Sequence, residues 1–239
     1  MTSQAELKQF ASLRMPKFRQ KYGQFTVEGR KAVHEVFHSR LKVVKILATK
    51  WYIDRYNPEY DCDIISDPDN LKLSQYDTPP GIIAVVEIPK EPQWNHNQTL
   101  TLALDGISDP GNMGTIIRIA DWYGVNQILM STDCVDVYNN KCLAATMGSF
   151  TRVDCIYTDL LETLKGKKVF GAFLAGTSIY KLKLEEPTVL LIGSESHGIR
   201  EHLNEVVTTS ITIPKIGEAE SLNAGVATAI MLDRLCVPS

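Results

Sequence analysis

Apolar residues in the second half of the chain fall into short continuous runs, and segments with helical spacing of apolar positions lie between most of these runs. The runs predict strands over residues 100–104, 127–131, 169–175, 189–193 and 210–213. The helical patterns lie near residues 114–123, 141–147, 160–164 and 222–236. Because continuous apolar strands alternate with helices, we expect a mostly parallel sheet covered on both faces.

The first ninety residues predict a smaller α/β unit. Helical patterns lie near residues 5–13 and 29–39, and strand patterns at 43–48, 62–66 and 82–88. Residues 89–98 are polar, contain prolines and lack periodicity, which is typical of a linker. We therefore predict a first domain over residues 1–90, a linker over 91–98 and a second domain over 99–239.

Other features of the sequence favour a cytoplasmic protein that is not embedded in a membrane. No apolar run is long enough to span a bilayer, and the first residues lack the basic and apolar regions of a signal peptide. The five cysteines are scattered without a C-x-x-C pair, a pattern that argues against both a disulfide framework and a zinc site. We therefore expect no metal site.

The charge of the chain is strongly polarised. Residues 1–50 hold eleven Lys and Arg against three acids, a net charge of +8, whereas the whole chain carries −3, so the remainder carries −11. A basic end of this kind fits the phosphate backbone of a nucleic acid, although a solvated helical face would give the same composition. The residues that we expect to contact RNA are Arg14, Lys17, Arg19, Lys21 and Arg30.

Three segments share one order of parts: a strand, a polar loop that contains glycine, and a helix. They cover residues 105–124, 190–203 and 213–230. Ligands of parallel sheets bind beyond the carboxyl ends of the strands, so we expect the three loops to form one composite site. The sequence has neither G-x-G-x-x-G after a first strand nor G-x-x-x-x-G-K-[ST], which excludes the two commonest phosphate-binding loops.

Several polar residues in these loops are candidates for the site. In the first loop, we expect Asn112 to cap the start of a helix and Arg118 to lie on an otherwise apolar stretch, either in a salt bridge with Asp121 or Glu195 or at the edge of a cleft. Glu195 directly follows an apolar strand, so we expect it to be partly buried. Two further candidates, Ser221 and Asn223, lie at the entry to the last helix. Serine and asparagine are residue types that favour the start of a helix.

The three loops, DGISDPGNMGTIIRIADWYG, LLIGSESHGI and ITIPKIGEAESLNAGVATAIML, resemble in order and spacing the three motifs of the SpoU (TrmH-like) RNA 2′-O-ribose methyltransferases. LKQFASLRMPKFRQKYGQFTVEG and TPPGIIAVV resemble the small substrate-binding domain of that family. The resemblance implies an α/β fold in which a C-terminal α/β-knot domain, a deep trefoil knot, follows the small α/β domain. It also implies S-adenosylmethionine as methyl donor, a homodimer, and a structured RNA as substrate.

Carried over residue by residue, the resemblance assigns catalytic positions to Asn112, Arg118, Glu195, Ser221 and Asn223. The cofactor would contact mainly backbone groups, at Thr177, Gly193, Ile213 and Leu222. Arg118 is proposed in such families as the base, but an arginine with a pKa above about 12 is a poor base, so we expect it mainly to orient and stabilise.

The sequence leaves some alternatives open. The charge of the first domain favours a large structured RNA, with ribosomal RNA as our first expectation, over a small free substrate, but it does not separate ribosomal RNA from tRNA. The chain would otherwise be a non-catalytic RNA-binding or ribosome-assembly factor, or a base methyltransferase of the wider knotted superfamily. Two small departures from the family pattern, at Ser196 where glycine is usual and at Ala224-Gly225 where Val-Ser is common, affect positions that define the backbone.

Overall fold

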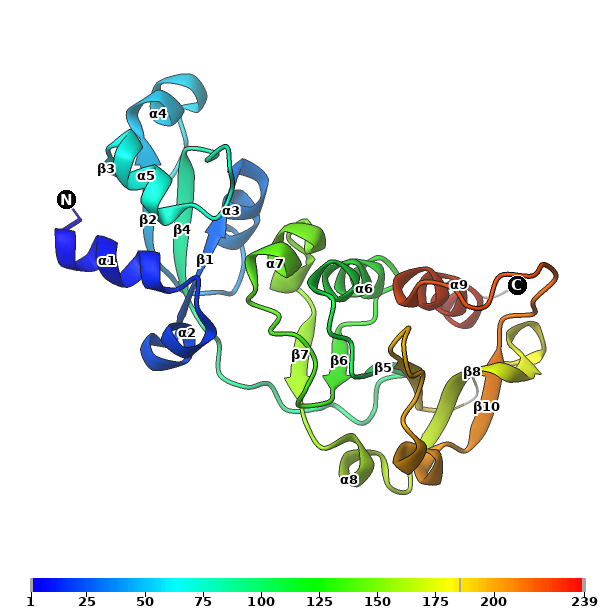
Figure 1. Ribbon diagram of the computed structural model, residues 1–239. Helices are drawn as coiled ribbons and strands as arrows, with labels where there is room; N and C mark the ends of the chain where they lie inside the picture. Colours follow the sequence, from blue (N-terminus) through cyan, green and yellow to red (C-terminus); the bar gives the residue numbers. More distant parts are fainter. Residues whose placement is uncertain (1, 185, 238–239) are drawn as a thin grey trace. The chain divides into compact units, whose positions relative to one another are not determined.

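The computed structural model describes residues 2–184 and 186–237. The chain divides into two compact units (Figure 1). The first unit contains the described residues up to Lys90 together with Tyr138–Thr151, and the second contains Glu91–Val137 and the described residues from Arg152 onward. Segment 138–151, which we expected in the second domain, therefore packs with the first unit.

The first unit is built on a mixed four-stranded sheet in the order β1-β4-β2-β3. Strands β1 and β2 are antiparallel to β4, and β3 is parallel to β2. The elements are α1 (Gln4–Ser12), α2 (Pro16–Tyr22), β1 (Gln24–Glu28), α3 (Arg30–Phe37), β2 (Val43–Thr49), α4 (Lys50–Tyr56), β3 (Asp63–Ile65), α5 (Asp67–Leu73), β4 (Ile82–Glu87) and, from the inserted segment, α7 (Asn140–Thr146).

Sequence patterns located part of this unit. The strands over 43–48, 62–66 and 82–88 and the helices near 5–13 and 29–39 are confirmed to within a few residues, whereas α2, β1, α4 and α5 were missed. The missed elements have five to seven residues, too few to show a clear period. Side-chain caps were readable signals for two of them, because Thr49 accepts from the backbone of α4 and Ser66 from that of α5.

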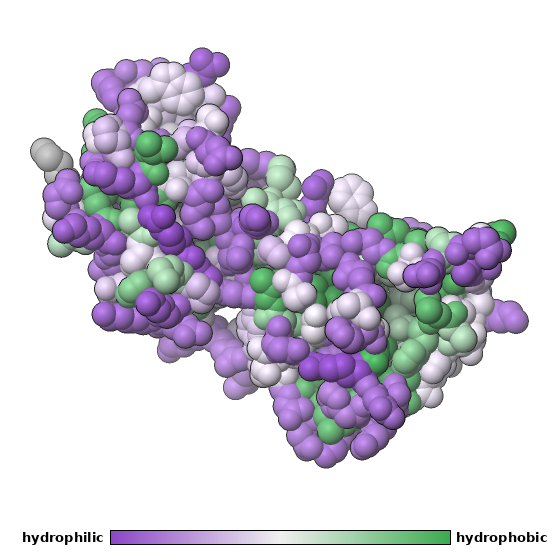
Figure 2. All heavy atoms as spheres, viewed as in Figure 1, coloured by the Kyte–Doolittle hydropathy of each residue, from purple (hydrophilic) through white to green (hydrophobic). Residues whose placement is uncertain are grey.

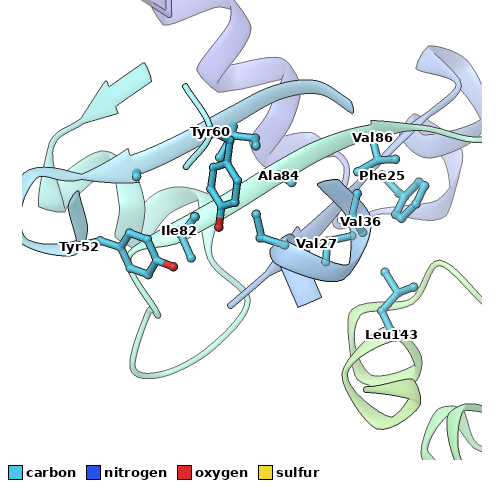
Figure 3. Close-up of a cluster of buried hydrophobic side chains, with 12 residues drawn as sticks. Phe25, Val27, Val36, Tyr52, Tyr60, Ile82, Ala84, Val86 and Leu143 are labelled. Carbon is cyan, nitrogen blue, oxygen red and sulfur yellow. The ribbon is translucent and has the colours of Figure 1, made fainter. Parts of the chain in front are cut away.

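The inserted segment completes the core of the first unit. The ring of Phe25 lies 4.5 Å from that of Tyr138 and 6.1 Å from that of Phe150. Leu143, from helix α7, points towards the strands and Val36 (Figure 3). These apolar and aromatic contacts explain why a segment distant in sequence belongs to this unit.

The second unit is built on a six-stranded sheet in the order β10-β8-β9-β5-β6-β7, and every neighbouring pair is parallel. The parallel sheet predicted from the sequence is thereby confirmed. The elements are β5 (Leu100–Asp105), α6 (Pro110–Trp122), β6 (Gln127–Met130), β7 (Asp154–Tyr157), α8 (Leu160–Leu164), β8 (Lys168–Ser178), β9 (Thr188–Gly193), the 3-10 helix η3 (Glu201–Val206), β10 (Thr209–Thr212) and α9 (Ala224–Cys236).

Helices cover this sheet on both faces, as expected. Helices α6 and α9 pack against each other on one side, and α8 packs with η3 on the other (Figure 1). Strand β7 was missed by the sequence analysis. All five cysteines are free thiols. Within the described residues, no helix has the length and apolar character that crossing a membrane requires.

Candidate active site

The three loops predicted to form the site all belong to the second unit, and each follows the carboxyl end of one of its strands. Strand β5 leads into α6, β9 ends at Gly193 before the loop 194–200, and β10 leads into the segment that precedes α9. Because β5, β9, β8 and β10 are consecutive neighbours in a parallel sheet, these ends share one edge. This edge is the expected place for a ligand in an open α/β fold.

Hydrogen bonds join one residue from each loop. The Asn112 side-chain amide donates to Oε1 of Glu195 at 2.5 Å, and that of Asn223 donates to Oδ1 of Asn112 at 2.8 Å and to Oε1 of Glu195 at 3.2 Å. The backbone N–H of Ala224 also donates to Oε1 of Glu195, at 3.2 Å. We call Asn112, Glu195 and Asn223 the amide–carboxylate cluster. It fixes the three loops relative to one another.

The helix caps at the starts of α6 and α9 determine which side chains of this cluster are available for hydrogen bonds between the loops. Asp109 caps α6 by accepting from the backbone of Asn112 at 2.7 Å, so the expectation that Asn112 itself caps this helix was wrong. Pro110 at the first position of the helix favours a cap at Asp109. The side chain of Asn112 is thereby free to bind Glu195. Asn223 does cap α9, accepting from Gly225 and Val226, as predicted for this residue type.

The loop after β9 folds tightly back on itself. The N–H of Gly198 donates to the carbonyl of Ser194 at 2.8 Å, and Gly198 adopts a left-handed φ of 65°. A Cβ on Gly193 would lie 2.0 Å from the carbonyl carbon of Gly198, so only glycine fits there. Glu195, at the tip of this turn, is exposed, which corrects the expectation that it is partly buried.

Arg200 anchors the same loop to the end of β5. Its backbone N–H donates to Oδ2 of Asp105 at 2.8 Å, and its guanidinium donates to Oδ1 of Asp105 and to both carboxylate oxygens of Asp133. The carboxylate of Asp105 is fully buried. The Ser131 hydroxyl and the Arg200 guanidinium hold the pKa of the Asp133 carboxyl below its usual range. No local sequence pattern links residues 105, 133 and 200, so this ion-pair network was not predicted.

Arg118 is exposed on α6. Neither expected salt bridge forms, since Asp121 pairs with Arg152 at 2.9 Å and Glu195 accepts from the amides of the cluster. Within residues 2–184 and 186–237, Arg118 has no hydrogen bond or ion pair, including to the amide–carboxylate cluster. Its guanidinium is therefore available to an external anion or hydroxyl.

The residues expected to contact a cofactor lie along the same sheet edge. Thr177, near the end of β8, pairs with Ile211 of β10, and Ile213 directly follows that strand. Gly193 ends β9, and Leu222 precedes α9 with a half-exposed side chain. Every residue from 214 to 223, including Ser221, is exposed, so this loop offers its backbone groups to a ligand.

The two departures from the family pattern have visible consequences. Gly225 lies where α9 meets α6, and a Cβ there would be 3.1 Å from the Thr115 methyl carbon, so the small residue permits a close helix contact. Ser196 is exposed, and its hydroxyl lies 2.8 Å from Nδ1 of His197. Ser196 has no hydrogen bond to the amide–carboxylate cluster among the described residues, and Gly225 contacts it only through its backbone N–H, which donates to Oδ1 of Asn223 at 2.9 Å.

The basic residues of the first unit separate into two groups. Exposed ones are Arg14, Lys17, Lys21 and Arg30. Arg19 is buried, and its guanidinium donates to the carbonyls of Leu13 at 2.8 Å and Arg14 at 3.0 Å. Its proposed role in contacting RNA is therefore corrected to a structural one, in which it satisfies backbone acceptors between α1 and α2.

Two family models match the chain. The SpoU rRNA Methylase family matches residues 99–233, and the MRM3-like substrate binding domain matches residues 4–84. The first match spans all three loops of the candidate site. Together they confirm the resemblance drawn from the motifs.

Individual relatives are similar over nearly the whole chain. One is 23S rRNA (guanosine(2553)-2′-O)-methyltransferase RlmP of Bacillus subtilis, 30% identical over 96% of this chain and 95% of its own length. A solved TrmH-family structure from Porphyromonas gingivalis is 35% identical, with 98% of each chain covered and a TM-score of 0.86. An AdoMet-bound rRNA methyltransferase from Sinorhizobium meliloti is 26% identical, with 98% of this chain and 95% of that chain covered and a TM-score of 0.85. The chain therefore belongs to the SpoU rRNA methylase family.

Proposed function

We propose that this protein transfers a methyl group from S-adenosylmethionine to the 2′-hydroxyl of a ribose in ribosomal RNA. The observation that carries the proposal is the amide–carboxylate cluster, which joins all three motif loops at the carboxyl edge of the parallel sheet. The Bacillus subtilis relative, similar from end to end, is named for 2′-O-methylation of 23S rRNA, which favours ribosomal RNA over tRNA.

The residues at this edge fit S-adenosylmethionine. The loop 214–223 is exposed throughout, and Gly193 leaves no side chain between the end of β9 and its loop, so backbone donors and acceptors are accessible. We assign the cofactor contacts to Thr177, Gly193, Ile213 and Leu222. The bound cofactor would supply an electrophilic methyl group on its sulfonium. The Sinorhizobium meliloti relative was solved with AdoMet bound, which supports this assignment.

We assign to Arg118 the contact with the RNA at the reacting ribose. Its guanidinium, which has no hydrogen bond or ion pair within the described residues, suits a phosphate or an oxygen that gains negative charge as its proton leaves. Asn112, Glu195 and Asn223 hold the loops so that the attacking oxygen and the methyl carbon stay aligned, and alignment of this kind supplies roughly 7–11 kcal/mol in well-oriented reactions. Ser221, exposed before α9, completes the polar set.

Replacement of Arg118 tests the proposal. We expect Arg118→Ala to abolish methyl transfer to ribosomal RNA while calorimetry shows nearly unchanged affinity for S-adenosylmethionine. Arg152→Ala is the matched control, an exposed arginine of the same unit that should retain activity. Equal loss of cofactor binding and activity in Arg118→Ala would contradict this division of roles.

Mapping of the modification separates the alternatives. Mass spectrometry of RNA from cells that lack this protein should show one lost ribose methylation in ribosomal RNA. Loss of a base methylation, or of a tRNA modification, would identify a different substrate. No lost methylation, together with no transfer of labelled methyl in vitro, would indicate a non-catalytic RNA-binding factor.

We also assign the RNA-binding surface of the first unit to Arg14, Lys17, Lys21 and Arg30. The two lysines lie over neighbouring aromatic rings, Lys17 at 5.0 Å from the Phe18 ring and Lys21 at 5.2 Å from the Tyr22 ring. Exposed positive charge beside partly buried aromatic rings suits RNA. Charge reversal at these residues should weaken RNA binding and lower its salt dependence, whereas Arg19→Lys should act on stability instead.

The quaternary state that we propose is a homodimer. Large apolar side chains are exposed on or beside α6 and α9, and they are Trp122, Leu222 and Val226. Figure 2 shows apolar residues gathered over the part of the second unit that carries α9, β8 and β10. Burial of such side chains between two copies would remove them from water. Light scattering should give twice the chain mass, and Trp122→Glu should give monomers.

The C-terminal segment is, in our proposal, threaded through the trefoil knot of the family. The neighbouring positions of β10 and β8 and the packing of α9 on α6 support this topology. Pulling both chain ends in a single-molecule experiment should give an extended length shorter than that of an unknotted chain. We propose a cytoplasmic location, supported by the similarity to a Bacillus subtilis rRNA methyltransferase, and fractionation would test it.

A further inference from the structure

The first unit carries three side chains of metal-binding type that play no part in the proposed methyl transfer. His34 lies on α3, and His38 is the residue that directly follows this helix. The two histidines are four residues apart, so their rings share one face. Glu59 lies in the loop after α4. Nδ1 of His34 and Nε2 of His38 are each 3.4 Å from Oε1 of Glu59, and the three ligand atoms all lie within 4.8 Å of one another.

The hydrogen bond of His38 fixes which of its nitrogens is available. Nδ1 of His38 lies 3.0 Å from the carbonyl oxygen of His34, and a carbonyl only accepts, so Nδ1 carries the proton. In the neutral ring, the lone pair is then on Nε2, which faces Glu59. A histidine that binds a metal usually donates its other N–H to a carbonyl or carboxylate in this way.

Two of the three spacings between the ligand atoms match those around a tetrahedral ion. Nitrogen and oxygen ligands that lie about 2.05 Å from zinc, at tetrahedral angles, are about 3.3 Å apart. The two histidine–glutamate spacings of 3.4 Å are close to that value. We propose that His34, His38 and Glu59 bind one divalent transition-metal cation such as Zn²⁺, with water as its fourth ligand.

The donor set also selects the class of cation. Two imidazole nitrogens and one carboxylate oxygen suit Zn²⁺, Ni²⁺ or Cu²⁺, whereas Mg²⁺ prefers oxygen ligands alone. His34 and Glu59 line a hollow of roughly 530 Å³ that Arg30 and Lys31 also line, and these cations oppose the binding of another. The side chains are about half exposed, so we expect weaker binding than at a buried structural zinc site.

This proposal revises our expectation of no metal site, which rested on the spacing of the cysteines. The signal in the sequence was His34-x-x-x-His38 on a predicted helix, a spacing that places both rings on one face. Glu59 could not be found from the sequence, because only the fold brings the loop after α4 to this helix.

Calorimetric titration of the whole, untagged chain with Zn²⁺ tests the proposal. We expect one ion per chain and no heat from Mg²⁺. His34→Gln, His38→Gln and Glu59→Gln should each weaken zinc binding at least about tenfold, by loss of a ligand. His202→Gln is the matched control, an exposed histidine outside the cluster, and should bind zinc as the original chain does.

A second measurement does not depend on the variants. Co²⁺ bound by nitrogen and oxygen ligands gives weak visible absorption, whereas thiolate ligands add strong near-ultraviolet absorption. The proposal would be overturned by thiolate absorption, by the absence of zinc binding, or by equal affinity in all four variants. Since none of these readouts involves methyl transfer, failure here would leave the proposed function untouched.

Discussion

Replacement of Arg200 by methionine should destabilise the second unit and loosen the loop that carries Glu195. Methionine keeps much of the length of the side chain but removes every guanidinium hydrogen bond to Asp105 and Asp133. Among the residues that the structure describes, the carboxylate of Asp105, with no exposed surface, would keep only the backbone N–H of Arg200, at 2.8 Å, as a donor. A buried charge that loses its partner is costly.

The magnitude follows from the burial of the two partners. Unit charges about 4 Å apart attract by about 4 kcal/mol at an effective dielectric constant of 20. Breaking a fully buried pair costs about 3–5 kcal/mol. Arg200 is 39% exposed, so water would reach part of the vacated volume, and we expect a loss of about 2–3 kcal/mol in the free energy of unfolding. The melting temperature should fall by roughly 4–12 °C.

Urea unfolding of Arg200→Met and Arg152→Met measures this difference. Arg152 also pairs with an aspartate, Asp121, but its side chain is 49% exposed and that of Asp121 is 23% exposed, so the loss of this pair should cost at most about 1 kcal/mol. The double variant Asp105→Asn/Arg200→Met should lose at least about 1 kcal/mol less than the sum of the single variants. If Arg200→Met and Arg152→Met lose equal stability, the buried ion pair does not anchor the loop.

Three further changes probe other parts of the chain. Gly193→Ala should displace the loop 194–199, cost about 1–3 kcal/mol and reduce methyl transfer, whereas Gly217→Ala, where a methyl group meets open space, should unfold like the original chain. Asn223→Ala should lose about 1 kcal/mol with the cap of α9, and Asn223→Ser should restore the cap but not the bonds to Asn112 and Glu195, so activity should stay low in both. Burial raises the pKa of Glu28, against the hydrogen bonds from Ser74 and Gln75, so its neutral form is favoured in the folded state and stability is lost as pH rises through that pKa. At pH values below the usual pKa of glutamate, Glu28→Gln should therefore have the same stability as the original chain. As the pH rises above that pKa, the variant should become progressively more stable than the original chain, which unfolding titrations from acid to neutral pH would measure.

The fold of the second unit was largely predictable because its signals are local. Each buried parallel strand is a continuous apolar run, and the strands that were predicted begin and end within a few residues of those observed. Strand β7 was the exception, since only Ile156 among its four residues is buried. The positions of the three loops at one sheet edge followed from the same alternation of strands and helices.

Other features depend on contacts that no local pattern encodes. Asp109 and Asn112 are both good capping residues, and which one caps α6 depends on where Pro110 begins the helix. Arg19 looks like its basic neighbours in composition, yet it is buried against backbone carbonyls five and six residues earlier. The alternation of strands and helices placed the loops of Asn112, Glu195 and Asn223 together, but it could not predict the hydrogen bonds among them, because the residues are separated by 28 to 111 positions.

The insertion of residues 138–151 into the first unit has a consequence for biosynthesis. The chain passes between the two units after residues 90, 137 and 151. The aromatic contacts of Phe25 therefore cannot form until Tyr138 and Phe150 have emerged from the ribosome, and these residues emerge only after strands β5 and β6 of the other unit. The first unit cannot finish folding in the order in which it is translated, so the two units acquire their cores over overlapping intervals. A fragment that ends at residue 90 would leave the ribosome with an aromatic surface still uncovered.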